Sequence, residues 1–237
     1  MNRKLLCAAM FGALCMCVSD MYGQKRMDIY DIANIKRYEA VNQETPAKQK
    51  KEKRVVFMGN SITEGWVGAH GDWFKENNYY GRGISGQTSP QMLLRFQDDV
   101  VALNPDVVVI NEGTNDIAEN SGNYHPTFTM NNIKSMTEIA LANGIKVILT
   151  SVLPHDKFLW NPSIADVTQK VDELNERIKA YASEKKIPYV DYHVEMRDSK
   201  GGMKKELSQD GVHPYPDTYF IMESLIKPII DKQLKKK

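Results

Sequence analysis

The chain has 237 residues, of which 42% are hydrophobic and 26% are charged, and its formal net charge is +1. A chain of this length can bury a substantial core within one domain, and the composition is that of an ordinary globular protein. Because positive and negative charges nearly balance, nothing in the composition points to a nucleic acid or an anionic membrane as a partner.

Residues 1–23 differ from the rest of the chain. They begin with the basic residues Arg3 and Lys4, continue with an apolar stretch over 5–18 and end in the small residue Gly23. The apolar stretch is shorter than the roughly 20 residues that a membrane-spanning helix needs. This pattern predicts a secretory signal peptide cut near residues 23–24. We therefore expect an exported protein, periplasmic or extracellular, without an integral membrane span.

Attachment of a lipid at Cys17 is the alternative for this segment, although the small residue expected just before a lipidated cysteine is missing. All three cysteines of the chain lie here, at Cys7, Cys15 and Cys17. Once residues 1–23 are removed, the chain would hold no disulfide, no thiol nucleophile and no cysteine metal site.

Residues 24–53 are predicted to form a helix followed by a linker. Apolar side chains recur every three residues, which predicts an amphipathic helix over 27–41; they are Ile29, Ile32, Ile35, Tyr38 and Val41. The stretch NQETPAKQKKEKR that follows is polar and rich in lysine. We interpret it as a solvated linker rather than a binding tail, and we place one domain at residues 54–237.

Within that domain, short apolar runs alternate with helical patterns. The runs predict five strands, over 55–58, 79–84, 107–110, 147–149 and 189–190. Helices are predicted over 89–103, 127–143, 163–185 and 216–233. Alternation of this kind indicates an α/β fold with a parallel sheet between helices. The continuous apolar run at 107–110 is typical of a strand that is covered on both faces.

Polar clusters fall at the carboxyl ends of these strands, which is where ligands bind in open parallel sheets. After the five strands in turn come Ser61, Gly86, Asn115, His155 and the pair formed by Asp210 and His213. The convergence of these residues at one edge of the sheet predicts an active site there.

Taken singly, each of these residues has an ordinary explanation. Serine is a favoured helix cap, Asn115 could be a turn residue, and Asp210 with His213 could form a turn, a surface pair or half of a metal site. Together they supply what acyl transfer requires: a hydroxyl nucleophile, a histidine base with a carboxylate three residues away, and donors for an oxyanion. We expect no metal and no organic cofactor.

Four blocks carry a family resemblance: "GNSITEGW", "GRGISGQTSPQMLLRF", "NEGTNDIA" and "DGVHP", in this order over 59–214. The chain resembles the SGNH (GDSL-type) hydrolases. The resemblance implies a three-layer α/β/α sandwich of flavodoxin-like character with a five-stranded parallel sheet. It also implies Ser61 as nucleophile, His213 as base and Asp210 as the residue that orients the base. The oxyanion donors it implies are the backbone N–H groups of Ser61 and Gly86 and the carboxamide of Asn115.

Two positions depart from the family pattern, and other side chains are candidates for substrate contact. Asn60 stands where aspartate is usual; its amide oxygen can still accept hydrogen bonds from loop N–H groups, so we expect activity to survive. Glu112 stands where a small or apolar residue is usual, and is either a surface carboxylate or a contact to a polar substrate. Trp66 and Trp160 belong either to the core or to a rim that stacks on sugars. His155 follows the fourth strand on the active-site side.

These observations predict a secreted serine esterase that works through an acyl-enzyme. Its partner would be a small-molecule or polysaccharide ester, and export together with polar loops favours a short acyl group such as acetyl on a carbohydrate. The resemblance also permits a lysophospholipase or lipase. A non-catalytic carbohydrate-binding protein on the same scaffold is a third alternative, but the complete set of site residues opposes it. The sequence leaves the oligomeric state open.

Overall fold

The structure, a computed structural model, describes residues 28–235. The predicted signal peptide, the alternative lipid site at Cys17 and the first residue of the predicted helix over 27–41 therefore lie outside the described residues. The chain divides into two compact units, residues 1–32 and 33–237. The described residues of the first unit form most of one short helix, α2 (Ile29–Ala33). The second unit holds the sheet and the site.

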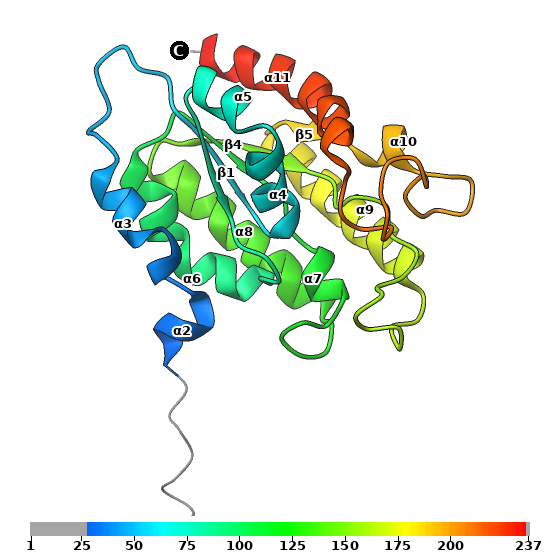
Figure 1. The fold of residues 1–237 in the computed structure, drawn as a ribbon. Coiled ribbons are helices and arrows are strands. Elements are labelled where there is room, and N and C mark those ends of the chain that lie inside the picture. Colours follow the sequence, from blue (N-terminus) through cyan, green and yellow to red (C-terminus); the bar gives the residue numbers. More distant parts are fainter. Residues whose placement is uncertain (1–27, 236–237) are drawn as a thin grey trace, which may run out of the picture. The chain divides into compact units, whose positions relative to one another are not determined.

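All five strands of the sheet run parallel (Figure 1). They are β1 (Val55–Gly59), β2 (Tyr79–Gly83), β3 (Val107–Ile110), β4 (Lys146–Thr150) and β5 (Tyr189–Val190). Their order in the sheet is β2-β1-β3-β4-β5. The five predicted strands are thus confirmed. The chain turns to opposite sides of β1 when it forms β2 and then β3, so the switch point at which such sheets bind ligands lies between β1 and β3.

Both faces of the sheet are buried, and alternate strand residues serve different cores. In β1, Val56 and Met58 pack in one core while Val55 and Phe57 pack in the other. Successive side chains of a strand point to opposite faces, so a strand covered on both sides needs apolar residues throughout. This explains why the strands appear in the sequence as uninterrupted apolar runs.

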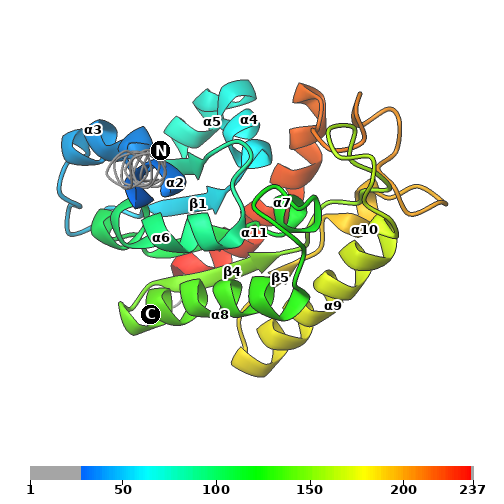
Figure 2. The same cartoon turned by 90° about the horizontal axis from the view of Figure 1, so that it is seen from below.

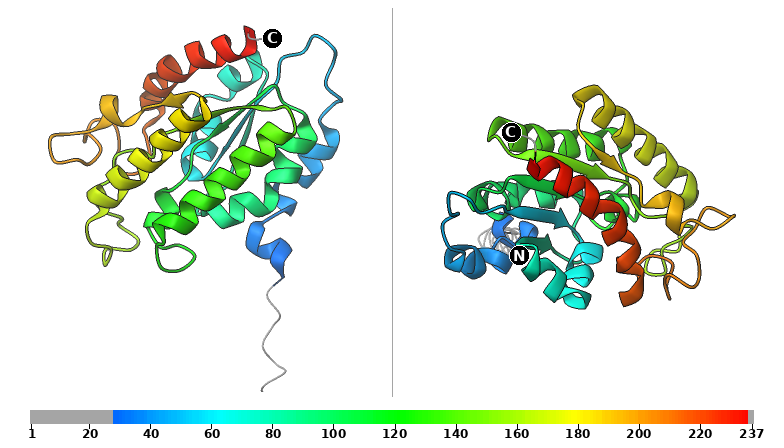
Figure 3. Two further views of the ribbon diagram at one scale, coloured as in Figure 1. Left: turned by 180° about the vertical axis from the view of Figure 1, so that it is seen from behind. Right: turned by 90° about the horizontal axis from the view of Figure 1, so that it is seen from above.

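Helices cover the two faces in separate layers (Figures 2 and 3). One layer consists of α6 (Ser89–Asp99), α8 (Pro126–Ala142) and α9 (Val167–Lys185). The other consists of α4 (Ser61–Ala69), α5 (Gly71–Glu76) and α11 (Tyr219–Lys235). The three-layer α/β/α arrangement is the predicted one.

The observed helices differ from the predicted ones in their bounds and in their number. A 3₁₀ turn, Val101–Leu103, follows α6, so the helix predicted over 89–103 stops four residues early. Another 3₁₀ turn, Pro216–Thr218, precedes α11. The helix predicted over 163–185 begins at Val167, the first residue of α9, rather than at residue 163. Four helices of the domain were not predicted: α4 and α5 between β1 and β2, α7 (Thr114–Ile117) after β3 and α10 (His193–Met196) after β5. Within residues 28–235, no helix combines the length and the apolar character that crossing a membrane requires.

The helix predicted over 27–41 is wrong as a single element. Asn34 adopts a left-handed conformation with φ of 50°, which ends α2, and a second helix, α3 (Lys36–Glu44), begins after it. The side chain of Asn42 in α3 donates to Asp99 Oδ1 at 2.6 Å and accepts from Arg82 Nη2 at 2.7 Å. These bonds attach α3 to α6 and β2, so this part of the N-terminal segment packs on the domain.

The predicted solvated linker is also anchored. Arg54 is only 2% exposed, and its guanidinium donates to the carbonyl oxygens of Leu103 and Pro46 and to the carboxylate of Glu52. A buried charge is costly unless it is paired and hydrogen-bonded, and these partners meet that need. The lysine-rich loop is therefore held at its end rather than free.

Gly83 sets how closely β2 approaches the start of α4, and a methyl group there tests that contact. A Cβ atom on Gly83 would overlap the backbone nitrogen of Glu64 and the carbonyl oxygen of Asn60, whereas one on Gly68 in α4 would meet nothing within 4 Å. We expect Gly83→Ala to lower the free energy of unfolding by about 1–3 kcal/mol, and Gly68→Ala to raise it by about 0.5–1 kcal/mol. Urea unfolding followed by circular dichroism measures both; equal stability of the two variants would contradict the tight contact.

Candidate active site

Ser61 is the first residue of α4 and is separated from the end of β1 only by Asn60. The helix is capped by its neighbour, because Asn60 Oδ1 accepts the N–H of Ile62 at 3.1 Å. The alternative that Ser61 is merely a helix cap is therefore wrong. The hydroxyl of Ser61 is left for another partner, and its backbone N–H belongs to the helical turn whose N–H groups have no partner inside the helix.

Three side chains are bonded in series at this position. Ser61 Oγ lies 2.9 Å from His213 Nε2, and His213 Nδ1 lies 2.6 Å from Asp210 Oδ2. With Nδ1 donating to the carboxylate, Nε2 is the nitrogen that can accept the proton of the serine hydroxyl. The structure thus brings together the three residues predicted to form the triad.

The carboxylate of Asp210 also shapes the loop that carries the histidine. Its Oδ1 accepts the backbone N–H groups of Val212 and His213, both at 2.8 Å, and the hydroxyl of Ser208 at 3.0 Å. Partial burial alone would raise the pKa of Asp210, but the bonds from the His213 ring and from the two N–H groups outweigh it and hold the pKa at about 2. The carboxylate is therefore ionised at neutral pH.

His155 supports this loop from behind. It is completely buried, with Nδ1 at 3.2 Å from the carbonyl oxygen of Gly211 and Nε2 at 3.1 Å from Thr114 Oγ1. Burial lowers the pKa of His155 to about 4, so the neutral ring donates to the carbonyl and accepts from the hydroxyl. The expectation that His155 contacts substrate is wrong, because no part of it reaches the surface. It connects α7 to the loop that carries Asp210 and His213, which we call the catalytic loop.

Besides the N–H of Ser61, the predicted oxyanion donors lie on the loop after β2 and in α7, the helix after β3. Gly86 is exposed and has φ of 77°, a conformation that glycine adopts readily. Asn115 in α7 is 3% exposed; its Nδ2 donates to the carbonyl oxygen of Gln87 at 2.8 Å, and its Oδ1 accepts from Asn120 Nδ2 at 3.1 Å. An amide carries two N–H bonds, so one remains beside the bond to Gln87.

Three of the residues predicted to contact substrate are buried instead. Trp66 is 2% exposed and stacks between Trp73 and Tyr219, with ring centroids 5.5 and 5.6 Å away, so it belongs to the core under α11. Asn60 is fully buried as the cap of α4. Glu112 is 2% exposed, and burial raises the pKa of its carboxyl group well above the usual range. It is therefore neither a surface carboxylate nor a substrate contact.

Trp160 lies at the surface beside the three bonded side chains, on what we call the rim of the site. Its side chain is 45% exposed, and its ring centroid is 6.2 Å from that of His213. A half-exposed indole thus stands beside the side chain predicted to act as the base.

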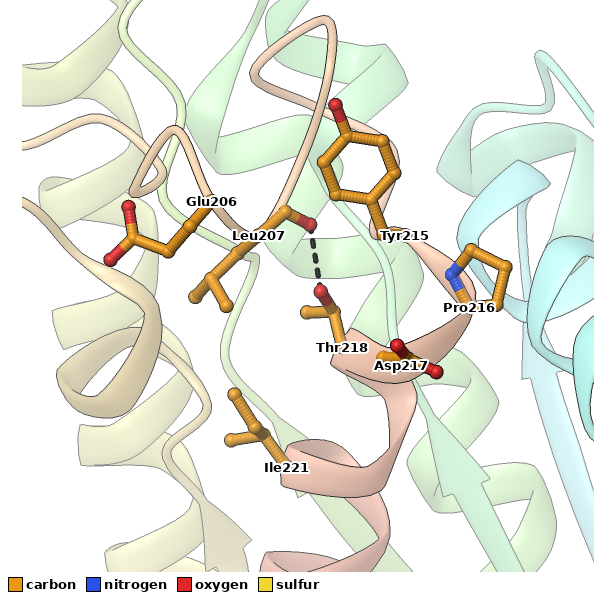
Figure 4. A pocket seen from close by; sticks show the side chains of 7 residues that line it. All are labelled: Glu206, Leu207, Tyr215, Pro216, Asp217, Thr218 and Ile221. Carbon is orange, nitrogen blue, oxygen red and sulfur yellow. Dashed lines mark hydrogen bonds between the residues drawn. The ribbon is translucent and has the colours of Figure 1, made fainter.

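Tyr215, also exposed, borders the site on the chain that follows His213. It lines a hollow of about 240 Å³ together with Asp210 and His213. It also lines a second hollow of about 470 Å³, shown in Figure 4, where the hydroxyl of Thr218 donates to the carbonyl oxygen of Leu207 at 2.9 Å. None of the residues around the second hollow belongs to the triad. In residues 28–235, no group of three or more His, Cys, Asp or Glu side chains is arranged to hold a metal ion.

One residue that the sequence does not single out touches several parts of the site. Asn120 follows α7 and bonds to Gly86, Asn115 and Trp160. In the sequence it is an asparagine in a polar loop and cannot be told from an ordinary turn residue. Only the positions of its partners, which come from separate segments, distinguish it.

A serine, an imidazole and a carboxylate in series beside N–H donors form the arrangement found in serine hydrolases. Residues 57–220 match the GDSL-like Lipase/Acylhydrolase family. The chain belongs to this family and is an ester hydrolase.

The chain is similar to solved structures and to a named protein sequence. A protein of Bacteroides fragilis assigned as an acylhydrolase is 56% identical, with a TM-score of 0.85 over 86% of this chain and 98% of that one. A GDSL-like lipase of Bacteroides thetaiotaomicron is 55% identical, with a TM-score of 0.83 over 85% of this chain and 98% of that one. An acetylxylan esterase of Xylanibacter ruminicola is 25% identical over 207 residues, which are 71% of this chain and 41% of the relative. The chain therefore spans less than half the length of that relative.

The buried histidine predicts a pH dependence of stability. His155 has a pKa of about 4 in the folded protein, against an ordinary value of 6.5. His155 therefore binds a proton more tightly in the unfolded chain than in the folded protein. The free energy of unfolding should fall as the pH drops through the window from about 6.5 to about 4, by about 3 kcal/mol from this group.

His155→Gln isolates this contribution, since a glutamine can keep a donor and an acceptor in the site without titrating. Urea unfolding of wild type and variant at pH 7.5 and 4.5 measures it. We expect wild type to lose about 2–3 kcal/mol more than the variant between the two pH values. The same loss in both proteins would show that His155 titrates normally.

Proposed function

We propose that this ester hydrolase is an exported enzyme that removes short acyl groups, above all acetyl, from carbohydrate. One observation carries the proposal: the hydrogen-bonded series from Ser61 through His213 to Asp210 opens beside the half-exposed indole of Trp160. The triad catalyses acyl transfer, and the exposed ring of Trp160 offers a flat surface to the alcohol part of the ester.

The mechanism follows from the geometry. Ser61 Oγ attacks the ester carbonyl while His213 Nε2 accepts its proton, and Asp210 stabilises the imidazolium that forms. The oxyanion accepts hydrogen bonds from the N–H groups of Ser61 and Gly86 and from the carboxamide of Asn115. Collapse of this intermediate transfers the proton from His213 to the departing alcohol. Water, deprotonated by the same histidine, then releases the carboxylic acid and restores Ser61.

The surroundings of the oxyanion donors favour a short acyl group. Ser85, which precedes Gly86, and Asn120, which bonds to its carbonyl oxygen, are exposed and polar, as is Ser121 next to Asn120. A long acyl chain gains its binding energy from burial against apolar surface, which these residues do not supply. An acetyl group needs little such surface.

The aromatic residues near His213 favour a sugar as the alcohol. Trp160 and Tyr215 are both exposed aromatic residues, and each lies near His213. Aromatic rings combine a large apolar face with a polar edge, which matches the mixed apolar and hydroxyl surface of a pyranose. The relative from Xylanibacter ruminicola, an acetylxylan esterase, supports the same chemistry, although this chain spans 41% of it.

Release of acetate from acetylated xylooligosaccharides, compared with release of fatty acid from lysophosphatidylcholine, tests the substrate class. We expect acetate release, and p-nitrophenyl acetate cleaved at least tenfold faster than the C8–C12 esters, because the polar side chains beside Gly86 offer little apolar surface to a long acyl chain. Ser61→Ala is the matched control, and its activity should fall by about 10⁴–10⁶. Faster cleavage of the long esters would select the lipase alternative, and an active Ser61→Ala variant would overturn the nucleophile.

Export is tested by the mass of the mature protein. A basic start, a short apolar stretch and a small residue near position 23 are the basis of this part of the proposal. We expect the full chain, expressed in a Gram-negative host, to accumulate in the periplasm with its first residue near Gln24. An intact N-terminus in the cytoplasmic fraction would contradict export, and a lipid mass on Cys17 would select the lipoprotein alternative.

A further inference from the structure

One exposed side chain connects two of the three predicted oxyanion donors, Gly86 and Asn115, to Trp160. Asn120 Nδ2 donates to Asn115 Oδ1 at 3.1 Å and to the carbonyl oxygen of Gly86 at 3.2 Å. Its Oδ1 accepts the indole N–H of Trp160 at 2.9 Å. The three partners come from the loop after β2, from α7 and from the loop between β4 and α9. An exposed asparagine that served only the turn would not need all of its polar atoms for such partners.

The direction of these bonds is fixed at both ends. An indole N–H can only donate, so the oxygen of Asn120 must face Trp160. The amide nitrogen of Asn120 then faces the oxygen of Asn115 and donates to it. At the far end, the carbonyl oxygen of Gln87 can only accept, and it takes an N–H of Asn115 at 2.8 Å. These hydrogen bonds therefore fix the orientation of the Asn115 carboxamide, with its oxygen toward Asn120 and its nitrogen toward Gln87.

That orientation decides whether Asn115 can act as a donor. If the carboxamide turned over, its oxygen would lie where its nitrogen lies now and would repel a developing oxyanion. The bond to Gly86 adds a second restraint, because it holds the peptide that follows the other predicted donor. We propose that Asn120 is a positioning residue that holds Asn115 and Gly86 in the orientation needed to donate to the oxyanion, with Trp160 fixing the direction of its amide. This inference rests on the proposed roles of Asn115 and Gly86.

Asn120 is held by its own backbone rather than by burial. Its N–H donates to the carbonyl oxygen of Asn115 at 3.1 Å, and the preceding Glu119 turns the chain with φ of 59°. Loss of its exposed side chain should therefore leave the fold intact. What should change is the fraction of molecules in which the carboxamide of Asn115 faces the right way, and this appears in kcat rather than in KM.

The test uses p-nitrophenyl acetate, so its outcome does not depend on the natural alcohol. The variants are Asn120→Ala, Asn120→Asp, Asn115→Ala and the double variant Asn115→Ala with Asn120→Ala. Asn123→Ala is the matched control, since Asn123 is an exposed asparagine of the same loop. Thermal midpoints measured by circular dichroism check that every variant is folded.

We expect Asn115→Ala to lower kcat by about 10²–10³ and Asn120→Ala to lower it by about tenfold, with KM within about twofold. Asn120→Asp should lose more than Asn120→Ala, because a carboxylate cannot donate and would oppose the oxygen of Asn115. In the Asn115→Ala background, the loss from Asn120→Ala should shrink to about threefold or less, since most of its effect passes through Asn115. Asn123→Ala should match wild type.

A second variant keeps the proposal testable should Asn120→Ala fail to fold. Trp160→Phe keeps the aromatic ring and removes the N–H that fixes the amide, and we expect kcat to fall by about twofold to fivefold. An unchanged kcat in both Asn120→Ala and Trp160→Phe, with Asn115→Ala impaired, would overturn the role of Asn120 while leaving the oxyanion donors in place. An undiminished loss from Asn120→Ala in the Asn115→Ala background would also overturn it. Full activity of Asn115→Ala would instead overturn the proposed donors themselves.

Discussion

All five strands run in one direction, and this constraint determines where everything else in the domain can be. Their carboxyl ends meet at one edge of the sheet, so loops far apart in the sequence become neighbours there. The serine follows β1, the second strand in the order, and the histidine lies on the loop between α10 and α11, after the edge strand β5. Their contact of 2.9 Å depends on the sheet staying rigid between them. Apolar cores on both faces supply that rigidity.

The parts of the fold that follow from local pattern could be predicted. A strand buried on both faces must be apolar throughout, so its position is visible in the sequence, as at 107–110. The triad was also predictable, because Asp210 and His213 lie within one turn and the family blocks surround them. The break at Asn34 was not, because apolar spacing reports which side chains share a face and says nothing of one residue with positive φ.

What could not be predicted depends on distant partners. Trp66 and Trp160 are the same residue type in similar stretches, yet one is stacked between Trp73 and Tyr219 and the other stands half-exposed beside His213. Contacts between segments that are distant in the sequence decide whether a tryptophan is buried or exposed. Hydrophobic periodicity carries no information about these contacts. His155 was correctly placed on the active-site side of the sheet, but its burial shows it to be a support for the catalytic loop.

Two neighbouring residues have separate tasks at the start of α4, because Asn60 caps the helix and the hydroxyl of Ser61 bonds instead to His213. Asn60 caps α4, so the geometry of the helix does not depend on the oxygen of its neighbour. The atom at the head of the triad can therefore be exchanged without loosening the helix that carries it. A thiol in place of the hydroxyl would take up the acyl group as a thioester. The mass that this thioester adds to the chain would identify the acyl group.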